Sequence, residues 1–225
     1  MNNAGIKAGF GILALALVMG LVLFGGAGTL AYWQAWAYMG VFFAAEVLLT
    51  LYLMRTDRAL LERRMRGGPT AEPELGQRIA MLLASIGFVA MLIVPALDHR
   101  FGWSHVPLVA EILGDVLTAI WFYICYLVFA VNAYSASTVE TFEDQRVIST
   151  GPYAVVRHPM YAAGALLFIG SPLALGSYWG LCALLIAAPA ILWRLFDEER
   201  VLIKTLPGYA EYLARVRWRL LPGVF

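Results

Sequence analysis

A cation, an imidazole and two tyrosines stand together directly before a long apolar run in the C-terminal half of the chain. The stretch reads Gly151-Pro152-Tyr153-Ala154-Val155-Val156-Arg157-His158-Pro159-Met160-Tyr161. A residue before proline is pushed out of the helical region, and proline suits the first position of a helix, so we expect a helix to begin at Pro159. The amides of Met160 and Tyr161 would then be unpaired at the positive end of that helix. Such an end is a site for a carboxylate or phosphate, although Arg and Tyr beside a spanning helix equally fit an interfacial anchor.

A second group of charged residues follows the last long apolar run. It comprises Arg194, Asp197, Glu198 and Glu199. Arg194 and Glu198 would share a helix face, so a plain ion pair worth about a few tenths of a kcal/mol would explain them. Carboxylates are disfavoured near a helix C-terminus, so a helix that ends here would need a bound cation to hold this cluster. If the helix instead continues to Leu206, that argument disappears.

The composition indicates a protein that crosses a membrane several times. Of 225 residues, 61% are hydrophobic and 14% are charged, whereas charged residues make up about a quarter of a soluble domain. Several stretches of about 18 or more residues carry almost no charge, which is typical of spanning helices. The net charge of +1 favours no nucleic-acid partner. Cys125 and Cys182 have neither metal-ligand nor disulfide-framework spacing, so we predict no metal site.

We predict an all-α, multi-pass transmembrane helical bundle of about five to six membrane helices. The expected helices are residues 8–24, 30–54, 79–97, 108–133, 159–168 and 179–196. The last two form a helical hairpin that turns from Gly170-Ser171-Pro172 to Gly176-Ser177, and its first arm is short for a full span. Polar connectors occupy residues 55–78 and 134–158. We therefore expect one integral domain, in which residues 1–133 supply the first four helices and residues 134–225 form the candidate site.

The basic residues predict the orientation of this bundle. If residues 55–78 lie in the cytoplasm, threading the helices places all of the 16 Lys and Arg on that side except Arg100. This is the positive-inside pattern of membrane proteins. It puts both candidate groups and the C-terminal segment at the cytoplasmic face of a bacterial inner membrane or an endoplasmic reticulum.

In order and spacing, residues 145–222 resemble the isoprenylcysteine carboxyl methyltransferase family and its phospholipid methyltransferase relatives. The pieces that carry the resemblance are Gly151-Pro152-Tyr153, Arg157-His158-Pro159-Met160-Tyr161, Arg194 with Glu198-Glu199, Gly208-Tyr209-Ala210-Glu211-Tyr212 and Arg219-Leu220-Leu221-Pro222. One departure is that the glycine expected two places after the motif tyrosine stands one place later, at Gly164. The first four predicted helices show no such match.

The resemblance implies an enzyme that uses S-adenosylmethionine without a Rossmann fold and releases S-adenosylhomocysteine. It implies that the cofactor is bound by Gln145, Val147, Ile148 and Tyr153 on the adenosine side and by Arg157, His158, Pro159, Met160 and Tyr161 around its methionine part. Glu198, with Glu199 as a second candidate, would take the ammonium group of the cofactor. Arg194 would face the methyl acceptor as the catalytic residue.

We expect the acceptor to be a carboxylate of a lipid-linked or hydrophobic molecule that enters from the bilayer. A carboxylate is already ionised near pH 7 and needs no base, and Arg194 would orient it by a two-pronged contact. Methylation of a phospholipid or a small amine is the alternative, although it requires the loss of a proton. A sterol-reductase-like enzyme that uses NADPH is a third interpretation. A non-enzymatic carrier or scaffold would instead use Glu46, with Glu111 and Asp115, to line a path through the membrane.

Overall fold

Helices form the regular elements of the protein in its computed structural model, which describes residues 3–67, 70, 75–135 and 145–225. In chain order they are α1 (Asn3–Ala27), α2 (Trp33–Thr56), α3 (Arg58–Met65), α4 (Leu75–Phe101), α5 (Leu108–Val131), η2 (Gly151–Ala154), α6 (Pro159–Ala174), η3 (Trp179–Ala183), α7 (Leu184–Thr205) and α8 (Tyr209–Arg215), where η marks a 3₁₀ helix. Within the described residues, five stretches are long and apolar enough to cross a membrane, namely α1, α2, α4, α5 and η3 joined to α7. Helix α6 is apolar but shorter. The predicted all-α, multi-pass architecture is confirmed.

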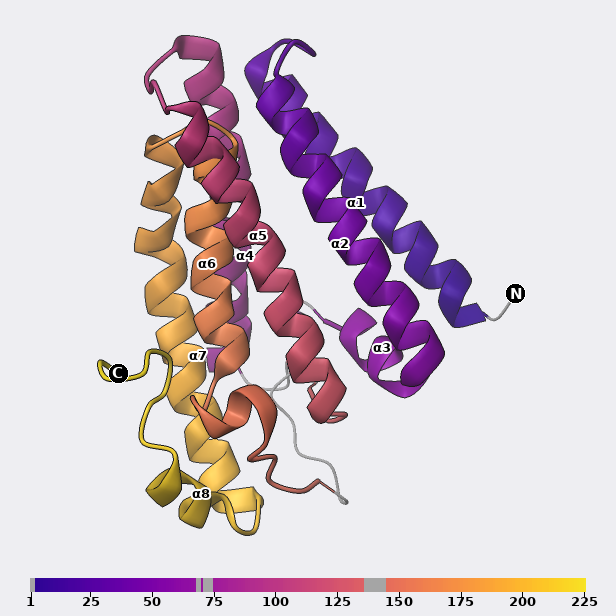
Figure 1. Ribbon diagram of the computed structural model, residues 1–225, viewed down its shortest axis with the longest axis vertical. Coiled ribbons are helices and arrows are strands. Elements are labelled where there is room, and N and C mark those ends of the chain that lie inside the picture. The colour runs from indigo at the N-terminus through magenta and orange to yellow at the C-terminus, as the bar shows by residue number, and fades with distance from the viewer. Residues whose placement is uncertain (1–2, 68–69, 71–74, 136–144) are drawn as a thin grey trace.

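The spanning helices fall into a bundle and a pair (Figure 1). Helices α4, α5, α6 and α7 form the bundle, in which α5 packs mainly on α6 and α4 on α7. Helices α1 and α2 form the pair, which joins the bundle through α1 against α4 and α2 against α5. The pair diverges from the bundle toward the end where α3 lies, and the start of α6, the end of α7 and α8 lie at that same end. The path of the chain thus brings the stretch that ends at the start of α6 and the charged residues near the end of α7 to one end of the molecule.

The polar stretch of residues 55–78, predicted to be a connector, contains a short helix. Helix α3 begins after Asp57, whose side chain caps it by accepting a hydrogen bond from the backbone N–H of Leu60 at 2.9 Å. Its buried residues are Leu60 and Leu61, which pack in a cluster with Ala8 of α1. A helix of eight residues depends on such packing rather than on its own periodicity, which is why the sequence pattern does not reveal it. Helix α4 likewise begins at Leu75, before the start predicted at residue 79.

The hairpin turns later in the chain than its sequence predicts. Gly170, Ser171 and Pro172 lie inside α6, and the chain reverses around Gly176, whose φ of 71° is a conformation that glycine adopts readily. Gly170 instead allows close packing, because a Cβ there would lie 2.7 Å from the carbonyl oxygen of Gly114 in α5. Small residues let helix backbones approach closely in membranes. The glycine that was taken as a turn signal therefore marks a helix contact.

Helix α7 continues to Thr205, well beyond the end predicted at residue 196. Asp197, Glu198 and Glu199 therefore lie inside a helix, and the electrostatic penalty for carboxylates at a C-terminus does not apply to them. The condition under which this cluster would need a bound cation, a helix that ends here, is therefore not met. The partners of these carboxylates come from the fold.

Polar contacts tie the helices together at the end of the bundle opposite α8. The Asp98 carboxylate accepts hydrogen bonds from the hydroxyl groups of Ser104 and Ser177, at 2.6 and 2.5 Å. The Glu111 carboxylate, considered above as part of a path through the membrane, accepts a hydrogen bond from Gln34 Nε2 at 3.0 Å. The contacts of Asp98 tie the turn between α6 and α7 to α4, and the contact of Glu111 ties α2 to α5.

We expect the substitution Gly114→Ala to destabilise the bundle by about 1–3 kcal/mol, the usual cost of overpacking. The added Cβ would lie 2.5 Å from the backbone carbonyl oxygen of Gly170, and backbone cannot swing aside as a flexible side chain can. The matched control is Gly40→Ala in α2, where a Cβ meets nothing within 4 Å. Thermal unfolding of the detergent-solubilised variants measures both effects, and an equal Tm for the two variants would contradict the proposed close contact.

Candidate active site

A cavity of about 410 Å³ lies at the end of the bundle that carries α8. Its walls come from α3 to α8 and from residues 145–158 of the connector. With the exception of Glu199, every site residue predicted from the sequence lines this cavity, namely Gln145, Val147, Ile148, Tyr153, Arg157, His158, Pro159, Met160, Tyr161, Arg194 and Glu198. The structure thus brings together the start of α6 and the acidic part of α7. The roles of these residues toward a cofactor stay predictions.

The start of α6 has the geometry that the sequence predicts. Pro159 occupies the first turn, and His158 before it has φ −124° and ψ 68°, outside the helical region. His158 provides no side-chain hydrogen bond to the first turn of the helix. The amides of Met160 and Tyr161 therefore remain suited to an anionic group from a ligand, at the positive end of a 16-residue helix.

Glu199 is the hub of a buried cluster of charges beside the cavity. Its carboxylate lies 3.3 Å from Arg157 Nη1, 3.3 Å from His158 Nε2 and 3.0 Å from Arg219 Nε. Burial of a carboxylate is costly unless it is paired, and these three partners supply the pairing. Glu199 therefore ties α7 to the residues that precede α6 and to the C-terminal segment, while its neighbour Glu198 faces the cavity.

Arg157 makes further contacts in this cluster of Arg157, His158, Glu199 and Arg219, which we call the clamp. Its Nε donates to the carbonyl oxygen of Val216 at 2.6 Å, and its Nη2 donates to that of Leu213 at 2.9 Å. The backbone N–H groups of Arg157 and His158 in turn donate to the carbonyl oxygens of Trp218 and Arg219, at 2.9 and 3.0 Å. Arg157 lines the cavity, but these contacts make it a residue that positions the start of α6 and the C-terminal segment.

A chain of hydrogen bonds holds Glu198 and Arg194 on either side of Tyr161. The Tyr161 hydroxyl donates to Glu198 Oε2 at 2.5 Å and accepts from Arg194 Nε at 3.2 Å. Arg194 Nη1 also donates to Gln77 Oε1 at 3.2 Å, and Gln77 Nε2 donates to Asp197 Oδ2 at 2.5 Å. Sequence reasoning missed Gln77, because it lies in α4, outside the stretch that carries the resemblance. The one feature of the sequence that could have indicated Gln77 is its amide side chain at the start of a spanning helix.

The predicted adenosine side is a wall of aromatic and branched side chains. Tyr153 Oη accepts a hydrogen bond from Asn132 Nδ2 at 2.8 Å, and the Tyr153 carbonyl accepts one from the Tyr212 hydroxyl at 2.8 Å. Burial raises the pKa of Tyr153, and it raises the pKa of Tyr212 to about 12, so both side chains stay neutral phenols. Val147 packs against the cluster of Tyr209 and Tyr212 in α8. The wall is thus apolar and held rigidly by hydrogen bonds.

The charges that line the cavity are predominantly positive. Its described lining contains Arg64, Arg146, Arg157 and Arg194, and Glu198 is the single carboxylate there. Arg64 and Asn132 were not predicted, because they come from α3 and from the end of α5 and carry no motif of their own. The arrangement can bind a ligand that has a cationic group at Glu198 and anionic groups elsewhere.

The phospholipid methyltransferase family model matches residues 109–207, from the start of α5 to just beyond the end of α7. No curated protein matches the chain. The family match agrees with the resemblance predicted from residues 145–222. Together with the stretches that are apolar enough to cross a membrane, the match indicates a membrane methyltransferase. Helices α1 to α4 lie outside the matched residues.

We expect Glu199→Ala to destabilise the protein by about 3–5 kcal/mol, because it leaves buried cations without their partner. The C-terminal segment should also loosen, since Arg157 and Arg219 lose the group that holds them to α7. Thermal unfolding and limited proteolysis of the segment that follows α8 measure the two effects. Glu211→Ala, at an exposed position of α8, is the control. Equal Tm values and equal cleavage rates in the two variants would contradict the clamp.

Proposed function

We propose that the protein is an S-adenosylmethionine-dependent methyltransferase that esterifies a carboxylate of a hydrophobic or lipid-linked acceptor. One observation carries the proposal. The open amides at the start of α6 and the carboxylate of Glu198 line the same cavity, so groups of opposite charge lie within reach of one small zwitterionic ligand. The distribution of basic residues supports a cytoplasmic position for this cavity.

The residues of the cavity fit the chemical groups of the cofactor. A carboxylate suits the amides of Met160 and Tyr161 at the positive end of α6. An ammonium group suits Glu198, whose carboxylate is oriented by the Tyr161 hydroxyl. A flat adenine suits the apolar wall formed by Val147, Ile148 and Tyr153. The volume of about 410 Å³ lies within the range of about 300–1,000 Å³ that is usual for small-molecule sites.

Glu199 and Arg157 take a different part in this proposal from that implied by the resemblance. Because Glu199 is paired with three partners of the protein and does not line the cavity, we assign the ammonium contact to Glu198. We assign Arg157 to positioning the start of α6. The contact with the cofactor carboxylate then rests on the helix amides.

Arginines in the cavity support a carboxylate acceptor. Arg194 is buried and fixed from two sides by Tyr161 and Gln77, so its guanidinium is ordered before any acceptor arrives. Such a group can hold a carboxylate in line for transfer, and alignment contributes much of the rate in reactions of this kind. The bound cofactor would supply the electrophilic methyl group. Transfer yields a methyl ester and S-adenosylhomocysteine with no proton to move, which agrees with a cavity that has one carboxylate in its described lining.

Methylation of a phospholipid amine is the second candidate, and the description of the matched family favours it. An ammonium acceptor has to lose a proton before it can be methylated. In the described lining, the one carboxylate available as a base is Glu198, and it is engaged by Tyr161. The family match argues against the carrier and reductase interpretations, because neither accounts for it.

We expect Glu198→Gln to weaken the binding of S-adenosylhomocysteine by about 10- to 100-fold. A hydrogen bond to a charged group contributes about 1.5–3 kcal/mol, and every 1.4 kcal/mol corresponds to a tenfold change in affinity. Isothermal titration of the purified protein in detergent measures this affinity. Glu211→Gln, an exposed carboxylate outside the cavity, is the matched control and should bind as wild type does. Tight binding by Glu198→Gln would remove this residue from the site, and no binding by wild type would overturn the proposed function.

We expect Arg194→Lys to slow methyl transfer to long-chain carboxylates by about 10- to 100-fold, because lysine keeps the charge but loses the planar fork. The affinity for S-adenosylhomocysteine should remain within about twofold of wild type, since Arg194 faces the acceptor rather than the cofactor. Labelled S-adenosylmethionine offered with carboxylate lipids and with amino lipids provides the measurement. Arg200→Lys, an exposed arginine of the same helix, is the control. Transfer confined to amino lipids would establish the second candidate in place of the first.

A further inference from the structure

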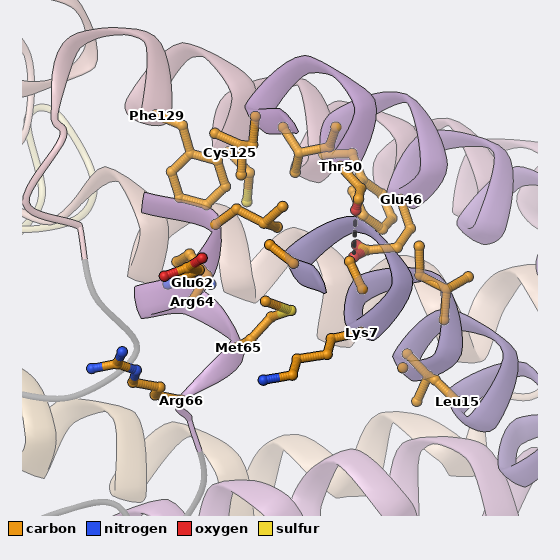
Figure 2. A pocket seen from close by; sticks show the side chains of 18 of the residues that line it. Lys7, Leu15, Glu46, Thr50, Glu62, Arg64, Met65, Arg66, Cys125 and Phe129 are labelled. Carbon is orange, nitrogen blue, oxygen red and sulfur yellow. Dashed lines mark hydrogen bonds between the residues drawn. The ribbon is translucent and has the colours of Figure 1, made fainter. Parts of the chain in front are cut away.

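A second and larger cavity lies between α1, α2, α3 and α5 (Figure 2). Its volume is about 790 Å³, within the range of about 300–1,000 Å³ of small-molecule sites. It occupies the space in which the α1–α2 pair diverges from the bundle. Helices α1 and α2 lie wholly outside the family match, and none of their residues lines the cavity proposed for the cofactor.

The walls of this cavity are apolar along the spanning helices and charged at one end. Side chains such as Ile12, Leu53 and Phe122 supply the apolar part. Figure 2 shows the charged side chains of α3 grouped at one end of the cavity, whereas Leu15 and Glu46 lie toward the other. The described lining also includes Lys7, near the start of α1. Lys7, Arg64 and Arg66 outnumber the carboxylates of the lining, and an apolar chamber with this excess of positive charge matches an amphiphile with an anionic head group.

Arg64 and Trp121 line both cavities, so the two cavities share a wall. The Arg64 guanidinium lies 5.0 Å from the centroid of the Phe129 ring, which orients it on the surface of α5. Burial lowers the pKa of Arg64, and the nearby carboxylate of Glu46 partly offsets this effect. Arg64 therefore lies between the chamber and the residues that we assign to methyl transfer.

The carboxylates of the described lining are Glu46 and Glu62, and an anionic head group would avoid both. Glu62 is exposed and lies at the same end of the chamber as Arg64 (Figure 2). Glu46 Oε1 accepts a hydrogen bond from Thr50 Oγ1 of the same helix at 3.5 Å, so the polarity of Glu46 is met in part by the wall itself. It lies toward the end of the chamber away from α3 (Figure 2). An apolar tail can pass along this wall while the head group remains at Arg64.

We infer that this chamber binds the methyl acceptor, a single-chain amphiphile from the bilayer whose tail lies along α1, α2 and α5 and whose carboxylate head group contacts Arg64 on the shared wall, from which it reaches Arg194 in the cofactor cavity. The inference rests on the proposed function, whose acceptor it locates. It explains why a half-buried arginine lies on the wall that the chamber shares with the cofactor cavity. Specificity for the tail then resides in α1 and α2.

The test measures equilibrium binding of labelled palmitate to the purified protein in neutral detergent, with hexadecylamine as the cationic counterpart. Gly11 lines the chamber and Gly9 does not, and a Cβ at either position meets nothing within 4 Å. We expect Gly11→Trp to weaken palmitate binding by at least about tenfold and Gly9→Trp to leave it unchanged. Arg64→Met should weaken it by at least about tenfold, whereas Arg58→Met, an exposed position of the same helix that does not line the chamber, should not.

Separate titration with S-adenosylhomocysteine distinguishes this inference from the proposed function. Normal binding of this product by Gly11→Trp shows that the variant is folded, so its loss of palmitate binding can be assigned to the chamber. If Gly11→Trp binds palmitate as wild type does, or if hexadecylamine binds as well as palmitate and loses affinity in Glu46→Gln, the inference is overturned. If palmitate behaves as expected but wild type fails to bind S-adenosylhomocysteine, the chamber stands and the proposed function fails.

Discussion

The carboxylate of Glu199 is the constraint on which the candidate site depends. A buried carboxylate is unstable unless cations and donors surround it, and here they come from two places, the residues before α6 and the C-terminal segment, while Glu199 itself belongs to α7. Arg157, one of the two arginines that pair with Glu199, also donates hydrogen bonds to the carbonyl oxygens of Leu213 in α8 and of Val216 just after it. One ion cluster therefore fixes how the helix start, the last spanning helix and the C-terminal segment meet. The cavity beside it keeps its shape because these three walls cannot move independently.

Two neighbouring carboxylates have different environments because they lie on a helix. Successive residues of an α-helix point about 100° apart, so Glu198 and Glu199 cannot face the same partners. Glu199 faces its own cations, and Glu198 faces the cavity, where the Tyr161 hydroxyl orients it. A helix that ended at residue 196 would have given neither arrangement. Because α7 continues to Thr205, the two carboxylates are not at a helix C-terminus. Glu199 belongs to the clamp, and Glu198 is a candidate ligand contact.

Local signals in the sequence allowed part of this site to be predicted. The helix start at Pro159 follows from the restrictions that proline places on itself and on His158, and these operate whatever the tertiary structure is. Gln77 could not be predicted, because its role arises from packing between α4 and α7. The same holds for Gly170, whose neighbours in sequence indicate a turn but whose neighbours in space require a close helix contact. Short helix α3 was missed because its stability comes from tertiary packing rather than from its own periodicity.

The candidate site is not confined to residues 134–225, to which the sequence prediction assigned it. Arg64, Met81 and Trp121 precede these residues and line the cavity along with the motif residues of the C-terminal part. Both parts of the predicted integral domain therefore contribute to the cavity. Residues 109–207 carry the family match, and α1 to α3 lie outside it while forming much of the second chamber. In our proposal the helices of the family match hold the methyl donor, and α1 to α3 hold the acceptor against α5. A change of acceptor would then require changes in α1 to α3, with the clamp around Glu199 left intact.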